Sequence, residues 1–272
     1  MRHPNNGEVI VQHKAKKRFG QNFLHDKRII GRIVSSINPK EGENIVEIGP
    51  GLGAMTLPAL ECCKKMTAIE LDRSLIENLQ KITAPIGELV LHQGDALKFD
   101  FGQLPTQQKL RLIGNLPYNI STPLLFHFVK WADRIQDMHF MLQKEVVQRM
   151  AAGPGSKTYG RLSVMLQYYC KVTPLFEIHP GAFNPPPKVD SAIVRLVPHE
   201  RPPVSVDDMQ LFSEMVTAAF NGRRKTIRNS LKKYLTEEQI QQAGIDPQIR
   251  PEQLELAQFA ALANAAKAGS SI

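Results

Sequence analysis

The tetrapeptide Asn115-Leu116-Pro117-Tyr118 carries groups suited to holding a planar, amine-bearing base. It follows the apolar run at 111–114, which predicts a buried strand ending in a turn. In open α/β sheets, ligands bind beyond the carboxyl ends of the strands. Asn115 offers an amide that donates and accepts hydrogen bonds, Pro117 fixes the turn, and Tyr118 presents an aromatic face. This turn is therefore our candidate for the reacting end of a site.

These groups suit alkylation of the exocyclic amine of adenine, which is a poor nucleophile because its lone pair is delocalised into the ring. Two acceptors, the Asn115 side-chain oxygen and the Leu116 carbonyl, would take hydrogen bonds from the amine and localise the lone pair. Tyr118 would stack on the base, which is worth about 1–3 kcal/mol. No general base is needed, because the ammonium product is acidic. Plain turn chemistry between a strand and a helix is the alternative interpretation.

A glycine-rich loop and two further acids indicate a nucleoside-bearing cofactor. The strand predicted at 44–48 enters the loop at 47–53, where glycines permit a tight turn and close approach of a ligand. With Ala54 this loop also satisfies the dinucleotide pattern Gly-x-Gly-x-x-Gly/Ala. Glu70 and Asp95 follow the next two predicted strands, at 65–69 and 88–92. Glu70 suits a ribose diol and so fits NAD as well, whereas Asp95 adds an acceptor for an adenine amine and favours S-adenosylmethionine. Each acid alone could instead be a helix N-cap.

Composition indicates an intracellular protein without a metal site. The chain has 272 residues, of which 42% are hydrophobic, enough for a full-sized α/β domain and a smaller one. No apolar run is long enough to span a bilayer, and no signal-peptide pattern is present, so we expect no membrane association. The three cysteines lack metal-ligand spacing and cannot pair completely, which favours a reducing, cytoplasmic setting.

The basic excess is concentrated in two clusters. The net charge is +8, and residues 1–28 hold seven Lys or Arg against two acids. The first cluster is Lys14, Lys16, Lys17 and Arg18, and the second is Arg223, Arg224, Lys225, Arg228, Lys232 and Lys233. Two such clusters outside the central fold favour a polyanionic partner whose affinity falls steeply with salt. Ordinary solvated surface is the alternative for either cluster alone.

The order of predicted elements indicates two domains. A flexible N-terminus at 1–13 precedes an α/β domain at 14–200, whose first helix begins after Asp26 and whose last two strands, 173–178 and 191–197, form an antiparallel pair. A linker at 198–203 leads to a small all-helical domain at 201–272. Its helices are predicted at 207–220, 224–234, 236–243 and 251–267, so that the second basic cluster lies on a helix.

The series of motifs resembles a known enzyme family. The loop at 47–53, Glu70, Asp95 and the turn at 115–118 are similar to those of Rossmann-like class I S-adenosylmethionine-dependent methyltransferases of the adenine-amine type, whose fold is a seven-stranded sheet. The segments 19–24, 183–191 and 222–231 resemble one branch in particular, the small-subunit ribosomal RNA adenine dimethyltransferases. The resemblance extends from about Lys14 to the C-terminus, and the glycine loop is its least specific motif.

The resemblance implies a set of roles. Asn22, Leu24, Gly49, Gly51, Glu70, Asp95 and Asn115 would contact S-adenosylmethionine, with Glu70 on the ribose and Asp95 on the adenine amine. Asn115, Leu116 and Pro117 would present the substrate amine, while Tyr118 and Phe183 would sandwich the target base. Arg223, Arg224, Lys225 and Arg228 would bind RNA together with the N-terminal cluster. For Phe183, a hydrophobic plug inside its proline-rich loop is the rival interpretation.

The implied activity is dimethylation of two adjacent adenosines in the 3′-terminal hairpin loop of 16S rRNA, with the small ribosomal subunit as partner. We expect a monomer, because the sequence shows no obvious apolar interface stripe. A large-subunit rRNA adenine methylase of the macrolide-resistance type is the nearest rival. An RNA-binding assembly factor with dispensable catalysis is a second. A DNA or glutamine methylase is a weaker third, because those enzymes more often carry Asn-Pro-Pro-Tyr at the turn.

Overall fold

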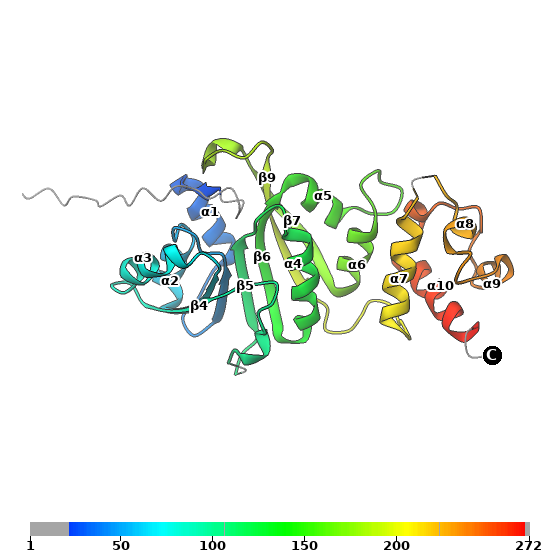
Figure 1. Cartoon of the computed structure of the whole chain (residues 1–272), viewed down its shortest axis with the longest axis horizontal. Helices are drawn as coiled ribbons and strands as arrows, with labels where there is room; N and C mark the ends of the chain where they lie inside the picture. The colour runs from blue at the N-terminus through cyan, green and yellow to red at the C-terminus, as the bar shows by residue number, and fades with distance from the viewer. Residues whose placement is uncertain (1–21, 106, 223, 270–272) are drawn as a thin grey trace, which may run out of the picture.

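The computed structural model describes residues 22–105, 107–222 and 224–269. Its centre is a seven-stranded sheet (Figure 1) with the order β4 (Glu88–Gln93), β3 (Lys65–Glu70), β2 (Asn44–Ile48), β5 (Leu110–Asn115), β6 (Ile135–Gln143), β9 (Ser191–Pro198) and β7 (Cys170–Ile178). The first five are parallel, and β9 runs antiparallel to both β6 and β7. The predicted seven-stranded sheet and its late antiparallel pair are confirmed.

The helices form two groups, one around the sheet and one at the end of the molecule where the C-terminus lies, as Figure 1 shows. Those that pack on the sheet are α1 (Lys27–Ile37), α2 (Thr56–Cys63), α3 (Arg73–Thr83), α4 (Ser121–Phe128), α5 (Lys144–Ala151) and α6 (Arg161–Tyr169). The C-terminal group is α7 (Met209–Phe220), α8 (Ile227–Leu231), α9 (Glu237–Gln242) and α10 (Leu256–Gly269). The expected helical C-terminal region is therefore present.

Alternation along the strands assigns the central side chains to two cores. Val46 and Leu112 point to the face covered by α4, α5 and α6, whereas Ile45 and Ile113 point to the face covered by α1 and α2. Asn115 is two residues beyond Ile113, so its side chain lies on the α1 face. The alternation of side chains along β5 thus determines from which face of the sheet the Asn115 side chain enters the site.

The order of the strands in the sheet determines where the site lies. The chain winds outward from β2 through β3 to β4, then returns to lay β5 on the other side of β2. Adjacent parallel strands that wind in opposite directions leave a crevice at their carboxyl ends. The glycine loop after β2, Glu70 at the end of β3, Asp95 after β4 and Asn115 at the end of β5 all lie at this edge.

Two contacts hold the chain before β2 against the sheet. Arg111 of β5 donates to the carbonyl of Ile37, at the end of α1, over 2.7 Å and binds buried Asp137 over 2.9 Å. Upstream of α1, the two-residue strand β1 (Phe23–Leu24) pairs antiparallel with β8 (Phe183–Asn184). Sequence patterns did not reveal that pairing, because two-residue strands carry no periodicity.

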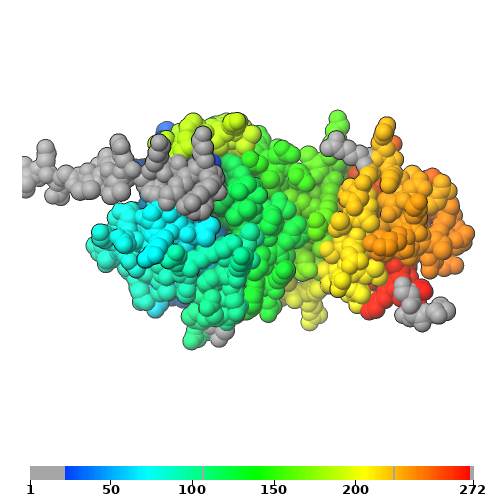
Figure 2. Space-filling model, viewed as in Figure 1, coloured from blue at the N-terminus to red at the C-terminus, as the bar shows by residue number. Residues whose placement is uncertain are grey.

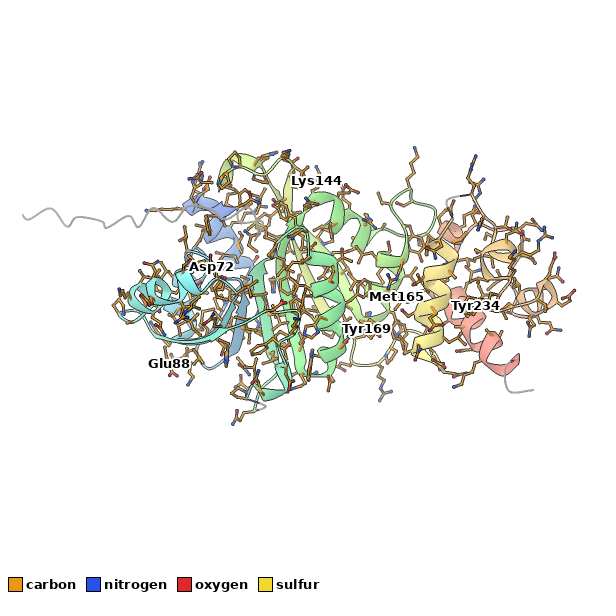
Figure 3. The ribbon with its side chains drawn as sticks, viewed as in Figure 1. Asp72, Glu88, Lys144, Met165, Tyr169 and Tyr234 are labelled. Carbon is orange, nitrogen blue, oxygen red and sulfur yellow. The ribbon has the colours of Figure 1, made fainter. Side chains whose placement is uncertain are left out.

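Helix α6 belongs to two hydrophobic cores. Its Leu162 and Leu166 pack with the sheet, while Val164 and Met165 pack with α7 and the helices that follow. Figure 3 shows Met165 between α6 and α7, and Figure 2 shows the C-terminal helices resting directly on the rest of the surface. Side chains of α6 therefore belong to both hydrophobic cores, and the domain boundary expected at residue 200 stays a prediction.

The helix predicted at 224–234 is wrong in extent. Only Ile227–Leu231 is α-helical, and Thr226 is its N-cap. Arg224 and Lys225 lie in the preceding turn, where the Lys225 amide donates to the Gly222 carbonyl over 3.2 Å. Of the described members of the second basic cluster, Arg224 and Lys225 precede α8, Arg228 lies within it, and Lys232 and Lys233 lie in the turn that follows it. The other C-terminal helices differ from the predicted bounds mainly at their ends, with a 3₁₀ turn at Pro251–Gln253 before α10.

Candidate functional site

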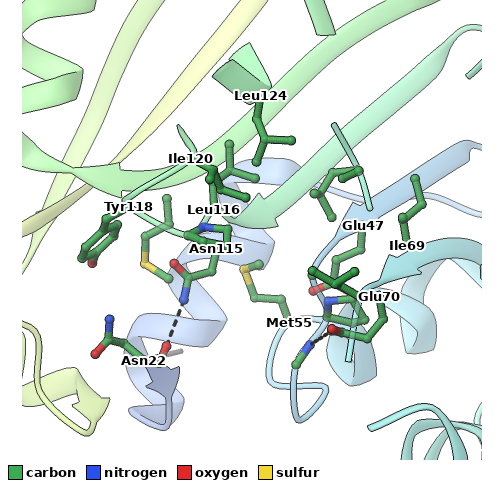
Figure 4. A pocket seen from close by; sticks show the side chains of 18 of the residues that line it. Asn22, Glu47, Met55, Ile69, Glu70, Asn115, Leu116, Tyr118, Ile120 and Leu124 are labelled. Atoms are coloured by element: carbon green, nitrogen blue, oxygen red, sulfur yellow. Dashed lines mark hydrogen bonds between the residues drawn. The ribbon is translucent and has the colours of Figure 1, made fainter. Parts of the chain in front are cut away.

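A cavity of about 360 Å³ opens at the carboxyl edge of the sheet. It brings together every predicted cofactor residue, namely Asn22, Leu24, Gly49, Gly51, Glu70, Asp95 and Asn115, and the turn residues Leu116, Pro117 and Tyr118. Figure 4 shows Asn115 and Tyr118 on one side of it and Glu70 on the other. Volumes of this size accommodate small molecules and cofactors.

The Asn115 amide is held in one orientation. Its nitrogen donates to the backbone carbonyl of Asn22 over 3.1 Å (Figure 4). Because the nitrogen is engaged there, the amide oxygen is directed away from Asn22 and remains an acceptor. Next to it, the Leu116 amide donates to the Met141 carbonyl over 3.1 Å. The turn therefore offers the two oxygen acceptors that the sequence predicts at the end of β5.

Tyr118 is anchored at both ends. Its carbonyl accepts from the Ser121 hydroxyl over 3.2 Å, and its phenol lies 2.5 Å from the Ser191 hydroxyl. Burial raises the pKa of the phenol, an effect that the bond to Ser191 opposes. The phenol therefore stays neutral at ordinary pH, and the ring lines the cavity in a fixed position.

The Glu70 carboxylate links the end of β3 to the glycine loop. One carboxylate oxygen accepts from the Gly51 amide over 3.2 Å and the other from the Asp72 amide over 2.8 Å. Burial raises the pKa of Glu70, and these two hydrogen bonds work against that rise. Gly51 has φ of 59°, a left-handed conformation that glycine adopts most readily. A Cβ there would lie 3.4 Å from the Phe23 ring, so the loop and β1 meet closely.

Asp95 follows β4 and combines a turn contact with a place in the cavity. The amide of Leu97 donates to its Oδ1 over 2.9 Å, which is a local turn contact. Asp95 also lines the cavity, and its carboxylate has a second oxygen. The local turn role and the predicted ligand role are therefore compatible.

Glu47 is a site residue to which the sequence patterns assigned no role. It is 1% exposed on β2, lines the cavity, and accepts from the Thr56 hydroxyl over 2.6 Å. Burial raises its pKa from 4.5 to about 7, and the Glu70 charge contributes to the rise. Its position directly before the glycine loop was the available signal. Its burial depends on α2, which no local pattern shows.

Charge along the cavity is one-sided. Glu47, Glu70 and Asp95 are the ionisable acids among the described lining residues, and these residues include no Lys, Arg or His. Such a lining favours a cationic ligand and disfavours the pyrophosphate of a dinucleotide. Among the described residues there is also no group of His, Cys, Asp or Glu that could hold a metal ion.

The base-stacking role of Phe183 stays a prediction, and the structure places its side chain away from the cavity lining. Its side chain is 2% exposed and packs with Leu24, Ile178 and Ile193, outside the cavity lining. The cause is the pairing of β1 with β8, which sets Phe183 directly opposite Leu24. Because the Phe183 side chain is buried outside the cavity lining, this geometry favours the rival interpretation, a hydrophobic plug beneath the loop.

The predicted RNA-binding residues are only partly described. Lys14, Lys16, Lys17, Arg18 and Arg223 lie outside the described residues. Arg224 and Lys225 are exposed, and Arg228 donates to Glu237 over 3.1 Å. That ion pair lowers the positive charge that Arg228 presents, so Arg224 and Lys225 are the stronger candidates of the three.

Comparisons with known proteins agree with this geometry. Residues 12–268 match the family described as ribosomal RNA adenine dimethylase. The chain is 58% identical over 258 residues to the Ribosomal RNA small subunit methyltransferase A of Vibrio parahaemolyticus, covering 94% of this chain and 96% of the relative. It is 55% identical over 259 residues to the protein of that name from Aeromonas hydrophila, with the same coverage of 94% and 96%.

Solved structures share the fold over most of the chain. A dimethyladenosine transferase from Plasmodium falciparum has a TM-score of 0.76 at 26% identity, over 88% of this chain and 95% of that one. The 23S rRNA methyltransferase ErmE has a TM-score of 0.71 at 23% identity, over 90% of this chain and 100% of that one. The second likeness, at its lower identity, concerns the fold alone.

Proposed function

The chain belongs to the ribosomal RNA adenine dimethylase family, and on that premise we propose that it dimethylates two adjacent adenosines in the 3′-terminal hairpin loop of 16S rRNA. It is an S-adenosylmethionine-dependent enzyme, and its substrate is the RNA of the small ribosomal subunit. The relatives named above carry the small subunit in their names, which disfavours the large-subunit alternative. A part in small-subunit biogenesis follows from that substrate.

The observation that carries the proposal is that the predicted cofactor residues and the predicted substrate-binding turn line one cavity. Asn115 and Leu116 line the same cavity as Glu70 and Asp95. An enzyme that transfers a group between two molecules must hold donor and acceptor side by side. Good alignment can contribute roughly 7–11 kcal/mol of barrier reduction.

The residues fit S-adenosylmethionine better than NAD. When bound, this cofactor supplies an electrophilic methyl group on a positively charged sulfur. The three acids of the cavity lining complement that positive charge. Glu70 and Asp95 would accept hydrogen bonds from the ribose hydroxyls and the adenine amine, and the open backbone at Gly49 and Gly51 would let the cofactor lie against the loop.

The chain's own part in the reaction is to position and polarise the acceptor. The Asn115 oxygen and the Leu116 carbonyl take both amine hydrogens, so the nitrogen lone pair turns toward the donor. Tyr118 holds the base by stacking. Methylation gives an acidic ammonium, which loses its proton to solvent, so none of these groups needs to act as a base. Repeating the cycle on the monomethylated amine gives the dimethyl product.

We further propose that the protein acts as a monomer in the cytoplasm, where small subunits are assembled. No helix among the described residues is long and apolar enough to cross a membrane. Arg224 and Lys225, together with the N-terminal cluster, would bind RNA phosphates.

The test supplies labelled S-adenosylmethionine with unmethylated small subunits, large subunits or duplex DNA, followed by digestion to nucleosides. We expect labelled dimethyladenosine from small subunits only. Asn115→Ala should lower kcat about 10²- to 10³-fold, the cost typical of losing one positioned polar group. Asn44→Ala is the matched control, because Asn44 begins β2 at the far edge and bonds only loop carbonyls.

Other outcomes separate the alternatives. Label in large-subunit RNA would move the protein to the resistance-methylase activity. Tight, salt-sensitive binding to small subunits with no label in any sample would make it an assembly factor without catalysis.

A further inference from the structure

Ser191 stands at the end of the proline-rich loop but outside the cavity. It is fully buried, and it sits on β9 opposite Gln143 of β6 and Ile178 of β7. Strands on both sides hold it, so its backbone is among the more constrained points of the sheet. Its hydroxyl lies 2.5 Å from the Tyr118 phenol.

The residues around Ser191 fix its end of the loop as well. The Asp190 carbonyl accepts from the Lys144 amide over 2.9 Å, and the Asp190 carboxylate lies 3.2 Å from the His179 ring nitrogen. Tyr118, by contrast, lies on a turn beyond β5 and presents a half-buried ring to the cavity. The bond therefore joins a side chain on a turn to a point inside the sheet.

We propose that Ser191 is a positioning residue for the methyl transfer, which acts by holding the Tyr118 ring in place through the hydrogen bond between the two hydroxyls. A stacking residue attached only through its backbone can swing about its Cα–Cβ bond. A second anchor at the phenol removes that freedom before the base arrives, so the base meets a preorganised surface. Two aromatic side chains line the described cavity: Phe23 lies against Gly51 of the glycine loop, and Tyr118 follows Asn115 in the substrate turn, so the position of Tyr118 matters for stacking.

This inference rests on the proposed function, and a double-mutant cycle tests it. The four proteins are the wild type, Ser191→Ala, Tyr118→Phe and the double variant, assayed on unmethylated small subunits. Either single change should lower kcat/KM for small subunits about 10- to 100-fold, the range that a misplaced group can cost. The double variant should be no slower than the slower single variant, because both changes remove one hydrogen bond. The dissociation constant for S-adenosylmethionine, measured by calorimetry, should stay within about twofold.

The cycle separates positioning from structural support. If Ser191 only stabilised the fold, Ser191→Ala would slow the enzyme by the same factor with Tyr118 intact or changed to Phe, and this additivity would overturn the proposal. Unchanged kcat/KM in Ser191→Ala would overturn it too. Ser163→Ala is the control, because Ser163 is equally buried but bonds the Arg149 carbonyl in α5, far from the turn. It should lower the melting temperature and leave kcat/KM unchanged.

Two further results keep the outcome definite. Should Ser191→Ala fail to fold, Tyr118→Phe removes the same bond from the half-buried side, and normal kcat/KM in that variant would reject the inference. A wild type that transfers no methyl group to small subunits would reject the proposed function itself. Failure confined to the Ser191 and Tyr118 variants leaves that function standing.

Discussion

Single side chains at the cavity serve structure and ligand at once. Glu70 is the clearest case, since its two oxygens accept from Gly51 and Asp72 while it lines the cofactor side. Asn115 is similar, with its nitrogen fixed by Asn22 and its oxygen directed elsewhere. Dual use of this kind orients a functional group at the cost of making it sensitive to isosteric change.

The first prediction concerns Glu70→Gln. A glutamine keeps one acceptor oxygen, so one of the two amides loses its partner and the negative charge disappears. We expect the dissociation constant for S-adenosylmethionine to rise about 10- to 100-fold, equivalent to about 1–3 kcal/mol. The measurement is calorimetric titration. Glu88→Gln is the control, because Glu88 begins the edge strand β4, is 60% exposed and pairs with Lys65. Equal affinity in both variants would contradict a cofactor role for Glu70.

The second prediction concerns Glu47 and pH. Its folded-state pKa of about 7 exceeds its ordinary value of 4.5, so between those pH values the folded state binds an extra proton and stability falls as pH rises. Glu47→Gln removes this loss. The free energy of unfolding of the variant should therefore gain about 1–3 kcal/mol on the wild type between pH 5 and 7.5. Urea unfolding across that range measures the difference.

In the wild type, the pH dependence that buried His139 gives to the free energy of unfolding opposes the one that Glu47 gives. Burial lowers its pKa from 6.5 to about 4, so the unfolded state binds the extra proton between those values and stability rises with pH. The two slopes offset each other where the windows overlap. Glu47→Gln should therefore show a clear rise in stability from about pH 4.5 to 6.5, and a variant as flat as the wild type would count against the burial-raised pKa.

At the scale of elements, the glycine loop and β1 lie side by side in the lining of the cavity. Gly51 has a left-handed φ, lies close to the Phe23 ring and donates to Glu70. Its conformation is imposed by the strand-to-helix turn, and its neighbours come from other parts of the chain. The glycine loop and β1 therefore pack directly against each other.

The third prediction compares two glycines. Gly51→Ala and Gly244→Ala both place a side chain at positive φ, 59° and 77°, and each should lose about 1–2 kcal/mol of stability. A Cβ at Gly244 has no neighbour within 4 Å, whereas one at Gly51 meets Phe23. Only Gly51→Ala should weaken S-adenosylmethionine binding, by about tenfold in the dissociation constant. Parallel denaturation and titration curves test this. Equal binding in the two variants would show that backbone strain alone operates at Gly51.

At the scale of the whole molecule, α6 joins the sheet to the C-terminal helices. The C-terminal region carries Arg224 and Lys225 in a turn, and Val164, Met165 and the rest of the shared core hold it to the sheet. A rigid connection of this kind would keep the proposed RNA contacts at a constant distance from the cavity. It also explains why residues 201–272 should not be treated as a detachable binding module.

The fourth prediction concerns salt. Changing Arg224 and Lys225 together to alanine should weaken binding to small subunits and reduce the slope of log affinity against log salt by about 1 to 2, roughly 0.7–0.9 for each phosphate that is no longer neutralised. Filter binding between about 50 and 200 mM salt tests it. The matched control changes Lys81 and Lys98, which are both exposed; Lys81 belongs to α3, which lies away from the C-terminal helices (Figure 1). An equal reduction of the slope in the control would indicate non-specific charge attraction.

The sequence by itself determined the strands, the loop and the candidate site residues. Apolar runs ending near Gly49, Glu70 and Asn115 identify strand ends, and strand ends in such sheets share one edge, so their grouping follows from local pattern and general topology. Asp26 as an N-cap was equally local, and the structure confirms it through bonds to the Arg28 and Ile29 amides.

Only the tertiary structure decided which side chains face the cavity and which are buried beneath it. Phe183 is turned inward because its strand pairs with one near the start of the described chain, with Leu24 opposite it. Burial raises the pKa of Glu47. The Ser191 hydroxyl forms a hydrogen bond with that of Tyr118, which lies 73 residues away in the sequence. These outcomes depend on contacts between distant segments. Local periodicity reports the conformation of a segment, but long-range packing sets its environment.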